Sequence, residues 1–210
     1  MKKVFITALL IASIGMYSYA QDFSFGVKAG FSLSTMSHDG NGTNVSHPFQ
    51  PGFTAGFFGQ CDLTDMFGVS MEALYAMQGY VSKSESVDYK NTIMTHMVKV
   101  PVLFNVNLLD GKLNLQAGPQ FGFILAEKSI GATYDGKNKI TNTVDQDYYN
   151  MFDLNVAIGA NFYLTDNLFA GVRYELGLMD TQKALKLSSA SIEDYNSKFR
   201  VITLMVGYRF

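Results

Sequence analysis

Seven charged residues fall at positions where an alternating strand pattern turns them toward one shared interior. They are Lys28, Glu72, Lys99, Asp153, Arg173, Glu175 and Arg209. Acids and bases enclosed at similar depth are the parts of a proton path, an ion-selective constriction or a catalytic acid/base pair. The alternative is a salt-bridged plug, because enclosed charges must pair to offset the loss of hydration. We predict the plug.

Histidines are the other residues with catalytic potential. His38, His47 and His96 are the only three, and a lipid hydrolase or acyltransferase would need one beside a serine or carboxylate. His96 shares its alternation phase with Met94 and Val98, which predicts a lipid-facing residue near the interface. No motif fixes the geometry of the other two. The sequence therefore predicts no catalytic residues, no cofactor and no metal site.

The first residues have the pattern of an export signal. Lys2 and Lys3 precede an apolar run from 4 to 16, and small residues lead up to Ala20. This pattern predicts a secretory signal peptide cleaved between Ala20 and Gln21. The predicted division is a signal peptide at 1–20 and one domain at 21–210.

Composition narrows the functional classes. The formal net charge of −2 gives no basic excess for nucleic acid, which we exclude as a partner. Cys61 is the single cysteine, so no internal disulfide forms. After the signal, no segment approaches the roughly 20 apolar residues of a spanning helix. Any membrane insertion must therefore use strands.

Eight segments alternate between apolar and polar residues with the period of a β-strand. We place them near 22–34, 52–61, 67–80, 93–108, 113–125, 152–164, 168–178 and 199–210. One face of each is aliphatic or aromatic, and the other is rich in Gly, Ser, Asn and Gln. A soluble barrel would put its charged face outside, so this polarity favours lipid around the barrel and a crowded polar interior.

The connections between these segments alternate in length. Short links at 62–66, 109–112 and 165–167 contain turn residues, whereas long polar links occupy 36–49, 81–92, 127–151 and 179–197. Short periplasmic turns and long outer loops are typical of transmembrane barrels. We predict an eight-stranded antiparallel up-and-down transmembrane β-barrel, and a soluble periplasmic barrel is the remaining alternative.

The final segment resembles the assembly signal of outer-membrane barrels. Its apolar face runs without a break to Tyr208 and the terminal Phe210. Phe23, Phe67 and Phe162 fall at the same predicted end of their strands, so these five aromatics predict a periplasmic girdle.

Two prolines test the predicted register. If the link at 109–112 is a tight turn, Pro101 faces Gln120 and Pro119 faces Val102. Proline cannot donate a ladder hydrogen bond, so the sequence predicts a bulge or local opening there.

Several short motifs, in order and spacing, resemble the PorT-like outer-membrane β-barrel family of Bacteroidota. They are Gly26–Ser34 (GVKAGFSLS), Glu72–Gly79 (EALYAMQG), Val100–Phe104 (VPVLF), Gln116–Gly122 (QAGPQFG), Gly171–Gly177 (GVRYELG) and Val206–Phe210 (VGYRF). The resemblance implies an eight-stranded barrel in the bacterial outer membrane. Most members have no assigned activity, and one namesake is linked to protein secretion.

Together these observations predict a monomeric barrel with a side-chain-filled lumen and four outer loops, acting in structure or recognition and not as an enzyme. Expected partners are outer-membrane lipid, lipopolysaccharide and the barrel-assembly machinery. The alternatives are a small pore, an accessory component of a secretion machine and a lipid-modifying enzyme.

Overall fold

The computed structural model describes residues 22–39, 49–84, 89–132, 139–143, 152–179 and 196–210. These residues contain nine strands: β1 (Asp22–Asp39), β2 (Gln50–Asp62), β3 (Phe67–Ser84), β4 (Tyr89–Leu108), β5 (Leu113–Ala132), β6 (Lys139–Thr143), β7 (Phe152–Tyr163), β8 (Leu168–Gly177) and β9 (Asn196–Arg209). In the described part of the chain, no helix is long and apolar enough to cross a membrane.

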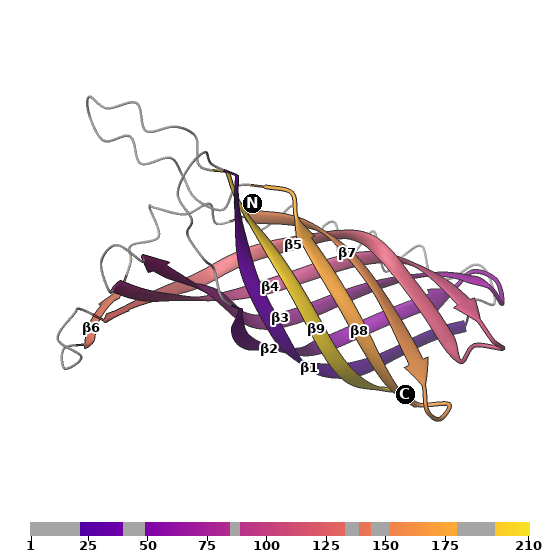
Figure 1. Cartoon of the computed structure of the whole chain (residues 1–210). Coiled ribbons are helices and arrows are strands. Elements are labelled where there is room, and N and C mark those ends of the chain that lie inside the picture. The colour runs from indigo at the N-terminus through magenta and orange to yellow at the C-terminus, as the bar shows by residue number, and fades with distance from the viewer. Residues whose placement is uncertain (1–21, 40–48, 85–88, 133–138, 144–151, 180–195) are drawn as a thin grey trace, which may run out of the picture.

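Eight of these strands close into an antiparallel barrel. The ring runs β1-β2-β3-β4-β5-β7-β8-β9 and returns to β1, because β9 pairs with both β8 and β1. Figure 1 shows the closed ring, with the short turns and the C-terminus at one end and β6 at the other. The predicted fold class and strand order are confirmed.

The structure corrects the predicted loop boundaries. Residues 127–151 were expected to form a loop, but β5 continues to Ala132 and pairs with the extra strand β6. Likewise β3 continues to Ser84 and β4 begins at Tyr89, inside the expected 81–92 link, and β1 continues to Asp39. These extensions are rich in polar residues. A strand outside the membrane has no lipid-facing side, so it lacks the apolar alternation from which the strands were predicted.

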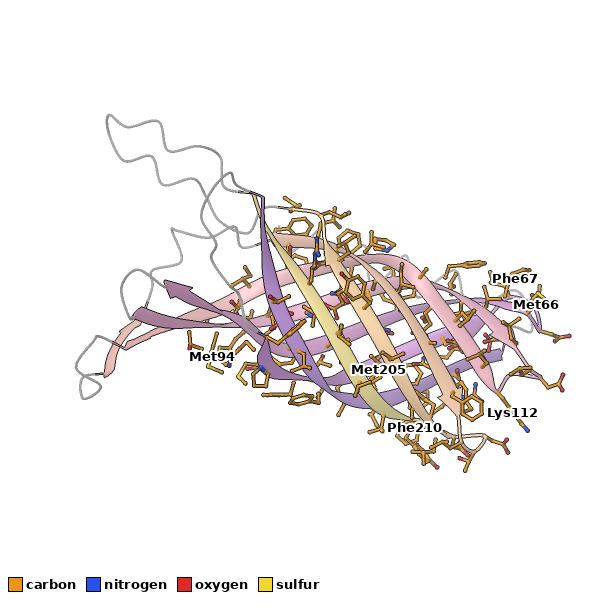
Figure 2. The ribbon with its side chains drawn as sticks, in the orientation of Figure 1. Met66, Phe67, Met94, Lys112, Met205 and Phe210 are labelled. Atoms are coloured by element: carbon orange, nitrogen blue, oxygen red, sulfur yellow. The ribbon has the colours of Figure 1, made fainter. Side chains whose placement is uncertain are left out.

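The outward-facing rows of the barrel are apolar. Phe25, Phe57 and Leu204 are 57%, 69% and 61% exposed, although soluble proteins bury such side chains. At the turn end, Phe67 and Phe210 lie close to the rim (Figure 2), and Phe67 stacks on Phe104 with ring centroids 5.7 Å apart. Phe23, Phe162 and Tyr208 are also outward and exposed, which places the predicted girdle as expected.

Two of the short turns share one hydrogen-bonding design. Thr64 lies in the β2–β3 turn, and its hydroxyl accepts from the backbone N–H of Phe67 at 2.9 Å. In the β7–β8 turn, the Thr165 hydroxyl accepts in the same way from Leu168 at 2.9 Å. The β4–β5 turn instead uses left-handed backbone at Leu109, Asp110 and Gly111. All three turns hold their strands in tight antiparallel hairpins.

The opposed prolines interrupt the β4–β5 ladder. Pairing stops at Pro101↔Gln120 and resumes at Phe104↔Ala117 without a change of register. This local opening, and the pairing of Pro101 with Gln120, confirm the predicted register. A true bulge lies farther out, where the register shifts between His96 and Met97. Neither proline accounts for it.

At the outer mouth, a serine holds β1 to β3 where β2 begins. The Ser34 hydroxyl donates to the carbonyl of Gly79 at 2.6 Å and accepts from its N–H at 2.9 Å. Its bond to the Gly79 carbonyl takes the place of the ladder bond that Pro51 of β2, which has no N–H, cannot donate. Ser34 therefore closes a gap in the barrel wall.

We expect Ser34→Ala to destabilise this mouth by about 1–3 kcal/mol, because two buried polar groups of Gly79 lose their partner. Hydrogen exchange should show faster exchange at the Gly79 amide and no change at the turn-end hairpins. Ser32→Ala, one inward-facing position away on β1, is the matched control. Equal protection of Gly79 in the Ser34 variant and wild type would contradict this role.

Candidate functional site

The barrel interior is the candidate functional site, because it gathers the charged residues that the sequence singled out. The structure places Lys28, Glu72, Lys99, Asp153, Arg173 and Glu175 inside, each at most 5% exposed. Three are basic and three are acidic, so the buried set is electrically balanced. Arg209 lies apart, at the turn-end mouth.

The first network crosses the full width of the barrel. Arg173 on β8 donates two hydrogen bonds to Glu72 on β3, at 2.7 and 2.8 Å. These strands stand four positions apart in the ring of eight, so they face each other. Lys28 on β1 contacts the same carboxylate at 2.5 Å, and Arg173 also donates to Gln116 on β5 at 3.0 Å. One carboxylate thus joins opposite walls.

A second network lies two residues farther out along β8. Glu175 accepts from Lys99 of β4 at 2.5 Å and from Gln120 of β5 at 2.8 Å. Nearer the outer end, Asp153 accepts from Asn155 at 2.8 Å. The predicted lumen charges therefore divide into two networks, because Glu175 pairs with Lys99 and not with Arg173.

An aromatic cluster lies in the lumen on the turn side of these ion pairs. Phe58, Tyr163 and Phe169 form a buried cluster, in which Phe169 meets Phe58 edge-on at 5.6 Å and Tyr163 at 5.3 Å between centroids. Glycine makes the space for it, because a Cβ on Gly207 would lie 2.3 Å from the Phe169 ring. The plug is therefore part apolar and part ionic.

Cations cover both sides of the aromatic cluster. The Lys28 ammonium lies 5.5 Å from the Phe58 ring centroid, and the Arg209 guanidinium lies 4.5 Å from that of Tyr163. Arg209 also donates to the backbone carbonyl of Asp166 at 2.8 Å, and Asn167 donates to the Arg209 carbonyl at 2.7 Å. A continuous column of side chains thus runs from the mouth to the ion pairs.

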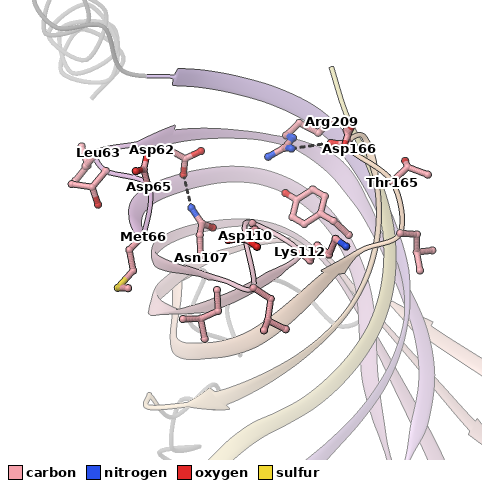
Figure 3. A pocket seen from close by; sticks show the side chains of 16 residues that line it. Asp62, Leu63, Asp65, Met66, Asn107, Asp110, Lys112, Thr165, Asp166 and Arg209 are labelled. Carbon is pink, nitrogen blue, oxygen red and sulfur yellow. Dashed lines mark hydrogen bonds between the residues drawn. The ribbon is translucent and has the colours of Figure 1, made fainter.

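A hollow of about 840 Å³ opens at the turn end, between the three short turns and Arg209. In Figure 3, the side chain of Asn107 points toward Asp62 and that of Arg209 points toward Asp166. The Asn107 amide donates to Asp62 at 3.1 Å. Tyr163 and Arg209, which belong to the column of side chains, line this hollow on its inner side.

The sequence of this barrel matches a known protein family. The family model described as the outer membrane protein beta-barrel domain matches residues 19–183. The chain belongs to this family. It is therefore a small β-barrel of the bacterial outer membrane. In such barrels the tight turns are periplasmic and the long links are extracellular. A search of curated proteins finds no significant match.

Neisserial surface protein A shares the fold of this chain at low identity, and two further solved structures align with it less well. Neisserial surface protein A is 13% identical, with a TM-score of 0.52, and 90% of this chain aligns with 99% of that one. The attachment invasion locus protein of Yersinia pestis is 14% identical with a TM-score of 0.49 over 90% and 99%. OprG of Pseudomonas aeruginosa is 11% identical with a TM-score of 0.46 over 90% and 97%.

The other singled-out residues of this family member lie outside the lumen networks. His96 faces outward, and its Nδ1 lies 2.6 Å from the Tyr75 hydroxyl. Tyr208 and Phe210 face outward at the turn end, and their role in assembly stays a prediction. The cleavage position at Ala20 and Gln21, and His47, lie outside the described residues. Of His38, only the backbone in β1 is described.

Sequence reasoning missed the apolar part of the plug. Phe58 was visible as a break in the polar face of its strand, but Phe169 and Tyr163 were not assigned a role. Their inward phase was available from the alternation with Arg173 and Asn161. Apolar residues on a polar phase are the signal that identifies such a cluster.

Proposed function

We propose that this protein is a closed structural or recognition barrel whose outer loops carry its specificity. The observation that carries the proposal is the bidentate Arg173–Glu72 pair, which crosses the lumen between opposite strands. An eight-stranded barrel has room only for its own side chains. Breaking this pair to admit a solute would leave buried charges without partners. A rigid scaffold with variable loops is the usual division of labour.

The proposal extends to partners. The apolar outward rows suit outer-membrane lipid, the outer rim suits lipopolysaccharide, and the strand ending in Tyr208 and Phe210 suits recognition by the barrel-assembly machinery. We propose a monomer of the PorT-like branch of Bacteroidota, with neither cofactor nor enzymatic activity. The motif resemblance supports this branch, but it does not transfer the secretion role of its namesake.

Conductance separates the closed barrel from a small pore. We expect the purified protein in planar lipid bilayers to give no single-channel steps above background. The variant Phe58→Ala/Glu72→Ala/Phe169→Ala, which removes the aromatic and ionic barriers together, should give steps if it folds. Heat-dependent gel mobility would establish folding before recording. Steps from the wild-type protein that disappear in Arg173→Gln would support a pore and contradict the proposal.

Co-purification tests the alternative that this protein is a component of a secretion machine. Purification of the native protein from membranes in mild detergent should yield the barrel with lipid alone. Stoichiometric recovery of secretion subunits would replace the proposal with an accessory role.

A further inference from the structure

One strand carries a charge on the lipid-facing surface. Among the outward-facing side chains of the eight barrel strands that the structure describes, Arg200 on β9 is the only charged one. It is exposed, and the next outward residues on β9 are Ile202 and Leu204, which are 41% and 61% exposed. Arg200 therefore lies where the apolar band ends at the outer side.

The surroundings of Arg200 are suited to an anionic headgroup. Its register partners are Thr35 on β1 and Leu176 on β8, so a hydroxyl residue and an aliphatic residue flank it. No carboxylate within the described residues forms an ion pair with it. A long cationic side chain at the edge of an apolar surface turns toward the headgroups.

The opposite side of the barrel changes polarity at its outer part as well. β4 stands four positions from β9 in the ring. Its outward His96 lies 2.6 Å from the hydroxyl of Tyr75 on β3. The described outer part of this side therefore carries a polar pair on its outward face.

The rim at the short turns is acidic. Its short turns carry three exposed acids and one exposed base, which are Asp65, Asp110, Asp166 and Lys112. This difference matches a membrane whose outer leaflet presents more anionic headgroups than its inner one. A guanidinium binds phosphate oxygens in a bidentate fork, which an ammonium cannot do.

We propose that Arg200 is the anchor of a binding site for a phosphorylated glycolipid of the outer leaflet. Its guanidinium binds a sugar-linked phosphate, while the acyl chains lie along Ile202, Leu204 and the neighbouring apolar rows. The inference deepens the lipid-partner part of the proposed function. It is independent of whether the lumen conducts.

Lipid titration tests the site. The delipidated full-length protein in detergent is titrated with bis-phosphorylated lipid A, with enzymatically dephosphorylated lipid A and with phosphatidylglycerol, and bound lipid is counted by native mass spectrometry. We expect preference for phosphorylated lipid A, and a loss of about tenfold in that affinity in Arg200→Gln. Arg200→Lys should lose part of it. Lys112→Gln, which removes one positive charge at the opposite rim, should bind as wild type does.

Three results would overturn the proposal: equal binding of phosphorylated and dephosphorylated lipid A, equal binding of phosphatidylglycerol, or unchanged affinity in folded Arg200→Gln. The second would identify a general anionic interface. Heat-dependent gel mobility shows whether each variant is folded, and Arg200→Lys provides the second readout if the glutamine variant is not. A conducting wild-type protein that still prefers phosphorylated lipid A would contradict only the closed-barrel proposal.

Discussion

Glu72→Ala should destabilise the barrel more than any other single loss of charge, by about 3–5 kcal/mol. The reason is that Glu72 is the shared partner of two buried cations, Lys28 and Arg173. Removing it leaves both in the lumen without their carboxylate. Urea titration of protein refolded into lipid vesicles, followed by far-UV circular dichroism and gel mobility, measures the change in the unfolding midpoint.

Two variants sharpen this experiment. Asp65→Asn removes an exposed carboxylate from the β2–β3 turn and should leave the midpoint unchanged. Replacing Lys28, Glu72 and Arg173 together with methionine removes the charges and their partners at once, so most of the stability should return. If Glu72→Ala unfolds at the wild-type urea concentration, the network does not hold the barrel together.

Phe169→Ala should have the second largest effect, at about 3–5 kcal/mol. Phe169 is 1% exposed and contacts both Phe58 and Tyr163. Its removal leaves a cavity that Gly207, directly opposite on β9, has no side chain to fill. The same urea titration measures the loss.

Phe57→Ala is the matched control, because it removes an identical ring from the lipid-facing row, where Phe57 is 69% exposed. Lipid chains fill the space outside, so no cavity forms and the cost should be clearly smaller. Equal losses in the two variants would mean that the aromatic cluster contributes no more than lipid contact does.

The strand faces were predictable because their signal is local. Alternation at two-residue spacing requires only neighbouring residues, and it placed Lys28, Arg173 and the other lumen charges on the inner side. The turn around Gly111 then related β4 to β5, so the pairing of Pro101 with Gln120 followed from counting residues. Where the alternation lost its apolar phase, as beyond Leu125, the strand ends were misjudged.

By itself, the sequence determined that this is an eight-stranded barrel with a polar interior and an apolar surface, because those features depend on local period and loop length. Only the tertiary structure decided which charges meet. Glu72 and Arg173 are separated by 101 residues and come together across the lumen because the ring closes with their strands on opposite sides. That distance depends on the closure and stagger of all eight strands together, which no local pattern contains. The same closure places Arg209 over Tyr163 at the mouth, and among the described outward-facing side chains it leaves Arg200 as the one charge in the apolar rows.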